Sequence, residues 1–186
     1  LEESLIYIRE ALSGDNQGFK GEYYQLEKFP VEPATLSEIP IIIGGGGKVK
    51  TPTLAGKYSE EFNIYAGPKE TLQNSINLFK SVASENGRDE KALEITTACP
   101  PVVGLTKESF DNSLITAAKA LIQPKDEIAK NWKDRSYLYG TPEDVVKTLS
   151  MWQEVGIEAV YLQLLDLEPS KRDESVEVIQ KAINLL

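Results

Sequence analysis

Short apolar runs alternate along most of the chain with segments in which apolar residues recur every three or four positions. The short runs predict β-strands, and the periodic segments predict amphipathic helices. Four strands are expected, at residues 39–43, 62–66, 92–99 and 159–165. The helices that follow them are expected at residues 48–58, 72–87, 110–121, 141–156 and 176–186. This alternation indicates an α/β fold of parallel β/α units joined by right-handed crossovers.

Local chemistry marks one helix start with particular clarity. Thr141 is a good N-cap residue, Pro142 suits the first helical position, and two acids follow near the positive end of the helix. Gly156 is expected to end this helix. Its inward-facing residues are expected to be Val145, Leu149 and Trp152. The final helix is expected to bury one face, formed by Val176, Ile179, Ile183 and Leu186.

Two regions lie outside the regular alternation. The first precedes the first strand: Leu1, Leu5, Ile8 and Leu12 predict an opening helix, and a loop is expected at 14–18. Residues 19–26 then form either a short hairpin or an irregular aromatic-rich flap, and Pro30 and Pro33 predict an extended lead-in. The second region is an expected insertion at about 105–140, with a short helix rich in Lys and Asp within 123–140.

The number of strands limits the architecture. A complete eight-stranded β/α barrel needs about 250 residues, whereas this chain has 186 residues. Either a small open α/β domain or part of a barrel fits that length. The only methionine is Met151, and the chain opens inside an amphipathic helix, as a piece of a longer protein would. We therefore expect residues 1–186 to form one domain, the C-terminal half of a TIM (β/α)8 barrel.

The end of the first predicted strand carries the clearest chemical signal. Ile39-Pro40-Ile41-Ile42-Ile43 runs directly into Gly44, Gly45, Gly46 and Gly47, and Lys48 to Thr51 then open a helix. Glycines can adopt positive φ and expose their N–H groups, and a helix N-terminus adds unpaired donors and partial positive charge. A strand, glycine loop and helix in this order favour an anion site, most often for phosphate. A plain flexible turn is the alternative.

Composition excludes several classes of function. The net charge of −9 argues against nucleic acid or an anionic membrane as the main partner, and no apolar run approaches the length of a membrane span. The chain has no histidine and one cysteine, Cys99, so zinc and His-dependent catalysis are not expected, and no metal site is assigned. Cys99 is expected to be a small buried hydrophobe. A single cysteine and no signal peptide fit a cytoplasmic protein.

Several short motifs occur in a familiar order. They are Phe19-x-Gly-x-Tyr-Tyr24, the glycine run with its preceding strand, Thr53-Leu54-Ala55 with Glu60-Glu61-Phe62-Asn63, Asn86-Gly87-Arg88-Asp89, and Gly140-Thr141-Pro142-Glu143 followed by Gly156-Ile157-Glu158-Ala159-Val160. Together they resemble the C-terminal half of the bacterial luciferase-like monooxygenase superfamily. Within it, the chain is most similar to the group that uses the deazaflavin coenzyme F420 or FMN.

That resemblance implies a β/α barrel with a flavin-type cofactor across its mouth. The cofactor's phosphate would be held by Gly44, Gly45, Gly46 and Gly47, with Lys48 to Thr51 completing the cradle. Hydride would pass between substrate and cofactor ring, or the reduced flavin would activate oxygen. Members commonly show Ala-Asp and Trp where this chain has Ser59-Glu60 and Phe62. The usual catalytic side chains belong to the first four strands, so no catalytic residue is assigned here.

Other polar residues have two interpretations each. Asn63 lies on the strand after the glycines and either faces the barrel mouth as a cofactor contact or makes an internal hydrogen bond. Lys48 and Lys50 either balance phosphate charge or are solvated. Glu60 and Glu61 are not expected to form an acid–base pair, because neighbours in sequence usually point apart.

Three functions remain open at this point. The first is an F420- or FMN-dependent oxidoreductase or monooxygenase acting on a small-molecule substrate, of which this chain is the cofactor-phosphate half and inactive alone. The alternative is a non-catalytic half-barrel that binds a phosphate-bearing ligand or a partner chain. An open parallel sheet favours a homo-oligomer or association with a missing N-terminal half. A free-standing nucleotide binder is the weakest, since Gly-x-Gly-x-x-Gly and a Walker lysine are both absent.

Overall fold

A parallel four-stranded sheet forms the centre of the computed structural model, which describes residues 1–13, 17–28, 35–164 and 169–186. Its strands lie side by side in chain order: β3 (Ile42–Gly45), β4 (Glu61–Tyr65), β5 (Glu94–Cys99) and β8 (Ala159–Leu162). All three pairings are parallel. The predicted α/β class with parallel β/α units is confirmed. Leu165, Pro30, Pro33 and part of the predicted loop at 14–18 lie outside the described residues.

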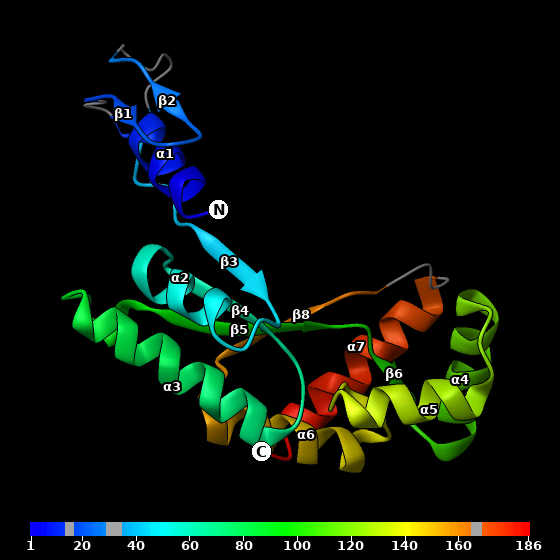
Figure 1. Ribbon diagram of the computed structural model, residues 1–186. Helices are drawn as coiled ribbons and strands as arrows, with labels where there is room; N and C mark the ends of the chain where they lie inside the picture. The colour runs from blue at the N-terminus through cyan, green and yellow to red at the C-terminus, as the bar shows by residue number, and fades with distance from the viewer. Residues whose placement is uncertain (14–16, 29–34, 165–168) are drawn as a thin grey trace.

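Helices cover one face of this sheet (Figure 1). They are α2 (Lys50–Tyr58), α3 (Lys69–Glu85), α6 (Pro142–Val155) and α7 (Pro169–Ile183). Alternate strand residues point toward them, so Phe62 of β4 stacks obliquely on Phe79 of α3 with ring centroids 5.3 Å apart. Trp152 of α6 is 2% exposed in the same core. Cys99 is fully buried there as predicted, and burial raises the pKa of its thiol to about 11.

The opposite face of the sheet is open. The residues that point to it alternate with the core residues and are mostly polar: Glu61 and Asn63 on β4, Thr96 on β5 and Tyr161 on β8. Ile42, Tyr65 and Tyr161 are 53%, 64% and 49% exposed. Among the described elements, none packs across this face in Figure 1.

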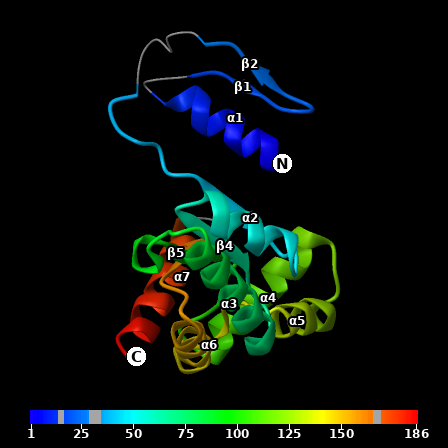
Figure 2. The same cartoon turned by 60° about the vertical axis from the view of Figure 1, so that its left-hand side comes forward.

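The N-terminal arm lies apart from the sheet (Figure 2). It consists of α1 (Glu2–Leu12) and the antiparallel hairpin of β1 (Phe19–Lys20) and β2 (Gln25–Leu26), so the hairpin alternative is the correct one. The Glu3 carboxylate accepts hydrogen bonds from the backbone N–H groups of residues 22–24 in the turn. Arg9 attaches the arm to the connection between α2 and β4 by donating to the Tyr58 carbonyl at 2.8 Å and to Glu60 at 2.9 Å.

Residues 100–140 form a lobe beside the sheet, and Val103 and Leu138 join it to the main core. It contains α4 (Lys107–Leu121), α5 (Lys125–Asp134) and two short parallel strands, β6 (Val102–Val103) and β7 (Tyr139–Gly140). The short helix predicted within 123–140 is confirmed as α5. The strands of this lobe were not predicted, because two residues are too few to show an alternation. A 3-10 turn, η1 (Glu90–Ala92), precedes β5.

Two expectations about these elements were wrong. The first strand is not 39–43 but Ile42–Gly45, because Gly44 and Gly45 pair with Asn63 and Ile64 of β4 despite glycine's poor strand propensity. The final helix does not bury Val176, Ile183 or Leu186, which are 49%, 47% and 55% exposed. Its buried face is formed by Ser175, Val178, Ile179 and Ala182. A pattern based on large apolar residues missed this face, because two of its members are small.

The close approach of α2 to α3 at Gly56 gives a stability prediction. A Cβ on Gly56 of α2 would lie 2.6 Å from the Phe79 carbonyl oxygen and 2.9 Å from the Val82 Cβ in α3. We expect Gly56→Ala to lower the free energy of unfolding in urea by about 1–3 kcal/mol, although alanine has the higher helix propensity. Gly67→Ala is the matched control, since a Cβ there meets nothing within 4 Å. A Gly56→Ala protein as stable as this control would contradict the close packing.

Candidate functional site

The glycine loop between β3 and α2 leaves little room for side chains at most of its positions. Gly45 has φ +148°, a conformation that L-residues rarely adopt. A Cβ on Gly46 would lie 2.8 Å from Tyr65 Cδ2, and one on Gly47 would collide with Thr51 Oγ1. Gly44 is different, because its nearest neighbour, the Asn63 carbonyl oxygen, would be 3.6 Å from an added Cβ. Gly45 is thus required by its backbone conformation, whereas a Cβ on Gly46 or Gly47 would have to displace the side chain of Tyr65 or Thr51.

The helix that follows the loop leaves its first turn available to an anion. Its N-cap residue, Val49, makes no side-chain hydrogen bond to the first turn, and that turn contains no acidic residue. Backbone N–H donors and the positive end of the helix dipole are therefore not neutralised locally. Lys48 and Lys50 are exposed at the same end. Glycine amides, a helix N-terminus and two lysines together form a suitable cradle for a phosphate group.

Asn63 lies beside this loop and is held by a network on the open face of the sheet. Its strand position pairs with Gly44, and its Nδ2 donates to Thr96 Oγ1 at 2.8 Å. The Thr96 hydroxyl donates in turn to Glu61 Oε1 at 2.5 Å. The Tyr161 hydroxyl donates to Glu61 Oε2 at 3.1 Å. The chain of contacts joins three adjacent strands, β4, β5 and β8.

The Glu61 carboxylate fixes the direction of this network. An ionised carboxylate only accepts hydrogen bonds, so Thr96 must use its single hydroxyl proton on Glu61. The Thr96 oxygen can then only accept, and Asn63 must offer it the amide nitrogen. The amide oxygen of Asn63 is left to accept a hydrogen bond from another group. The bond to Glu61, with a smaller contribution from burial, also raises the pKa of Tyr161, so its phenol remains a donor.

The structure brings the predicted site residues into one region. Gly44, Gly45, Gly46, Gly47 and Lys48 follow one another at the end of β3, and Asn63 is the strand neighbour of Gly44. The internal hydrogen bond considered for Asn63 is present, to Thr96. Sequence reasoning missed Thr96, Tyr161 and the part played by Glu61. The alternation of residues along each strand was the available signal, because it puts these side chains on the face opposite Phe62.

Glu60 and Glu61 point to opposite sides, as expected. Glu60 contacts Arg9 at 2.9 Å and Arg88 at 3.2 Å, whereas Glu61 belongs to the network on the open face. The residues that the structure describes contain no group of three or more His, Cys, Asp or Glu side chains suited to a metal ion. Within the same residues, no helix is both long and apolar enough to cross a bilayer.

Comparison with known proteins identifies the family. A family model for luciferase-like monooxygenases matches residues 1–159. The protein belongs to this family. The F420-dependent glucose-6-phosphate dehydrogenase of Amycolatopsis mediterranei (strain U-32) is 24% identical over an alignment of 179 positions, and the alignment covers 84% of this chain and 52% of that relative. The resemblance noted from the motifs is confirmed.

Solved structures show the same fold as this luciferase-like chain. An F420-dependent secondary alcohol dehydrogenase, in complex with an F420–acetone adduct, gives a TM-score of 0.73 at 24% identity over 97% of this chain and 60% of the other. The oxygenating constituent of 3,6-diketocamphane monooxygenase from Pseudomonas putida, in complex with FMN, gives 0.63 at 16% identity over 97% and 61%.

These relatives also show which cofactors the family uses. Both F420-dependent and FMN-containing enzymes resemble the luciferase-like chain, in agreement with the two cofactors expected from the motifs. The chain spans about half the length of the curated relatives it matches.

The polar network gives a second stability prediction. Thr96→Val keeps the shape of the side chain but removes one hydrogen bond from Glu61, which is 7% exposed, and one from Asn63. We expect the free energy of unfolding in urea to fall by about 1–3 kcal/mol. Thr53→Val in α2 is the control and should change it by less than about 0.5 kcal/mol. Equal effects of the two substitutions would show that the network contributes nothing.

Proposed function

We propose that the protein is an oxidoreductase or monooxygenase that uses coenzyme F420 or FMN and acts on a small-molecule substrate. In this proposal the chain is the C-terminal half of a TIM barrel, and its glycine loop holds the cofactor's phosphate. Membership of the luciferase-like family and the F420- and FMN-dependent relatives support the choice of cofactor.

One observation carries the proposal. The backbone of Gly46 and Gly47 lies so close to Tyr65 and Thr51 that an added Cβ would have to displace their side chains. A plain flexible turn has no need of such a fit, whereas a loop whose amides must approach a phosphate does. The uncapped first turn of α2 directly behind the loop adds further donors to the same place.

Each proposed site residue has a separate role. The amides of Gly45, Gly46 and Gly47 donate to phosphate oxygens, and Lys48 balances their charge. Asn63, held by Thr96, offers its amide oxygen to a donor group of the cofactor beside Gly44. When bound, the cofactor supplies the electron or hydride transfer. No residue of this chain is assigned as the catalytic acid or base.

The cofactor site gives a binding prediction. We expect Gly47→Ala to weaken binding of F420 or FMN at least tenfold, about 1.4 kcal/mol, because the new Cβ displaces Thr51 and the loop amides. Cofactor fluorescence measures the affinity, and urea unfolding shows whether the fold is retained. Gly67→Ala is the matched control and should bind like the unchanged protein. Full-length protein that binds neither cofactor, or a Gly47→Ala variant with unchanged affinity, would contradict the proposal.

A second candidate function is a non-catalytic half-barrel that associates with a partner chain. The exposed apolar side chains on the open sheet face, Ile42, Tyr65 and Tyr161, favour it. In either case we propose that further β/α units, from the same polypeptide or another copy, cover this face.

Association of the 186-residue chain tests this coverage. Light scattering after size-exclusion chromatography should give at least twice the mass of one chain, and Ile42→Lys should return it to the monomer by charging the open face. Lys57→Met, on the helix-covered side, is the control. A monomeric unchanged chain would contradict the association. Association without binding of F420 or FMN would favour the non-catalytic module.

A further inference from the structure

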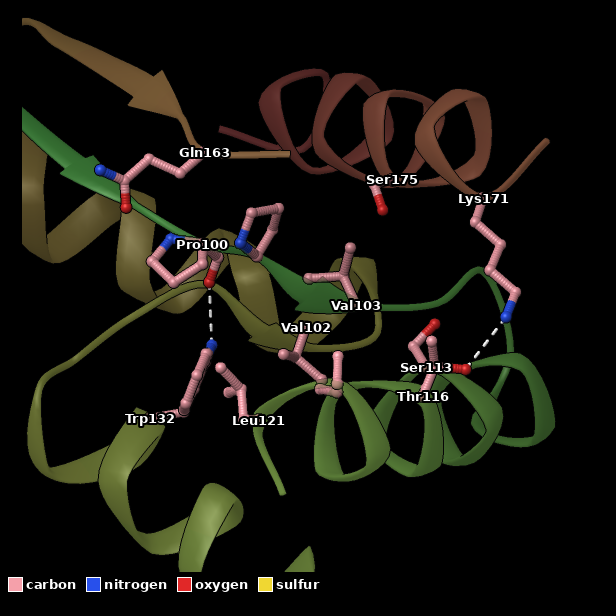
Figure 3. Close-up of a pocket in the computed structure, with 13 residues that line it drawn as sticks. Pro100, Val102, Val103, Ser113, Thr116, Leu121, Trp132, Gln163, Lys171 and Ser175 are labelled. Atoms are coloured by element: carbon pink, nitrogen blue, oxygen red, sulfur yellow. Dashed lines mark hydrogen bonds between the residues drawn. The ribbon is translucent and has the colours of Figure 1, made fainter. Parts of the chain in front are cut away.

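A cavity of about 130 Å³ lies between the lobe of residues 100–140 and α7 (Figure 3). Its walls are mainly apolar and include Pro100, Pro101, Val102, Val103, Leu121 and Trp132. The Trp132 ring is fixed, because its Nε1 donates to the Pro100 carbonyl at 2.8 Å. Pro100 directly follows β5 and Gln163 directly follows β8, so the cavity lies at the C-terminal edge of the sheet, where α/β proteins place their ligands.

One cation borders this apolar space. Lys171 of α7 is half-buried, and its Nζ donates to the Thr116 hydroxyl of α4 at 3.0 Å. Six other Lys or Arg side chains of the described chain form ion pairs with carboxylates, but none of these pairs includes Lys171. An ammonium beside apolar walls is unfavourable without an opposite charge. The site therefore favours an anionic group near Lys171.

A second polar group supports a ligand at the same place. Ser175 is one turn further along α7, is only 5% exposed, and lines the cavity. Figure 3 shows its hydroxyl directed toward the space between α7 and α4. Among the described residues, no partner accepts from or donates to this hydroxyl. Because the cavity leaves this hydroxyl accessible, it is free to pair with a polar atom of a ligand there.

We propose that this cavity binds a small carboxylate with an aromatic body. Its carboxylate contacts Lys171 and Ser175, and its ring lies against Trp132 and the two prolines. A cavity of about 150 Å³ in another protein holds benzene, so this space of about 130 Å³ suits one aromatic ring, with the carboxylate at its Lys171 border. Charge-assisted hydrogen bonds to Lys171 provide selection for the anion over a neutral analogue.

The carboxylate site is distinct from the glycine loop. That loop follows β3, whereas the cavity follows β5 and β8, which places the two roughly 10–15 Å apart at the usual strand spacing. Both lie at the same edge of the sheet. Binding of a carboxylate in the cavity needs no cofactor, so its test is independent of the proposed oxidoreductase function.

Benzoate and its neutral analogue benzamide are the probes. Calorimetric titration should show that benzoate binds at least about tenfold more tightly than benzamide, the difference expected for one charge-assisted hydrogen bond. In nitrogen–proton NMR spectra, the amide signals of Val102 and Val103 should shift on adding benzoate. Lys171→Met should remove the preference for benzoate while leaving the weak benzamide binding in place.

Two further variants serve as controls for benzoate binding in the cavity. Lys181→Met changes an exposed lysine of the same helix, paired with Glu177 at 2.9 Å, and should leave benzoate affinity unchanged. Ala117→Phe should fill the cavity and abolish binding of both probes, with the fold checked by the dispersion of the NMR spectrum. Equal affinity for benzoate and benzamide, or unchanged benzoate affinity in Lys171→Met, would overturn the proposal. So would shifts that avoid Val102 and Val103.

Discussion

The position of the first strand on the sheet depends on the Glu60 carboxylate. It accepts hydrogen bonds from Arg9 of the N-terminal arm, from Arg88 after α3 and from the Ile41 N–H at 2.7 Å. The Glu60 carboxylate offsets part of the positive charge of both guanidinium groups, and Arg9 also pairs with Glu38 at 3.0 Å. The Ile41 contact sets where β3 begins to pair with β4. Since that register places Gly44 beside Asn63, this ionic cluster acts with the backbone bond from the Glu60 N–H to the Ile41 carbonyl, at 3.0 Å, to position the glycine loop.

The next residue, Glu61, lies in a different environment from Glu60, because neighbouring side chains along a strand point to opposite faces. Glu61 points to the open face and has hydroxyl donors instead of cations. Consecutive acids therefore have different environments, one that fixes the fold and one that orients Asn63. A charged residue at 7% exposure persists because Thr96 and Tyr161 satisfy its oxygens. Within the part of the chain that the structure describes, no lysine or arginine forms an ion pair with Glu61.

Sequence patterns predicted the order of the main elements because each strand and helix has its own periodicity. Phe62, Phe79 and Trp152 are large and regularly spaced, so their burial could be read directly. The register of β3 could not, since glycine's low strand propensity hid its pairing with β4. The face of α7 was misassigned because Ser175 and Ala182 carry little apolar signal. The polar network depends on contacts between strands about 35 to 100 residues apart, which no local pattern contains.

The buried thiol of Cys99 is a natural probe of transient opening around β5. A thiol with a pKa of about 11 is almost entirely protonated at neutral pH, and no solvent reaches it in the closed structure. A thiol-reactive dye can therefore attach only during moments when β5 separates from the helices packed on it. Because the chain contains a single cysteine, the rate of attachment measures opening at one known position. The core of this sheet can thus be followed in time without introducing any label site.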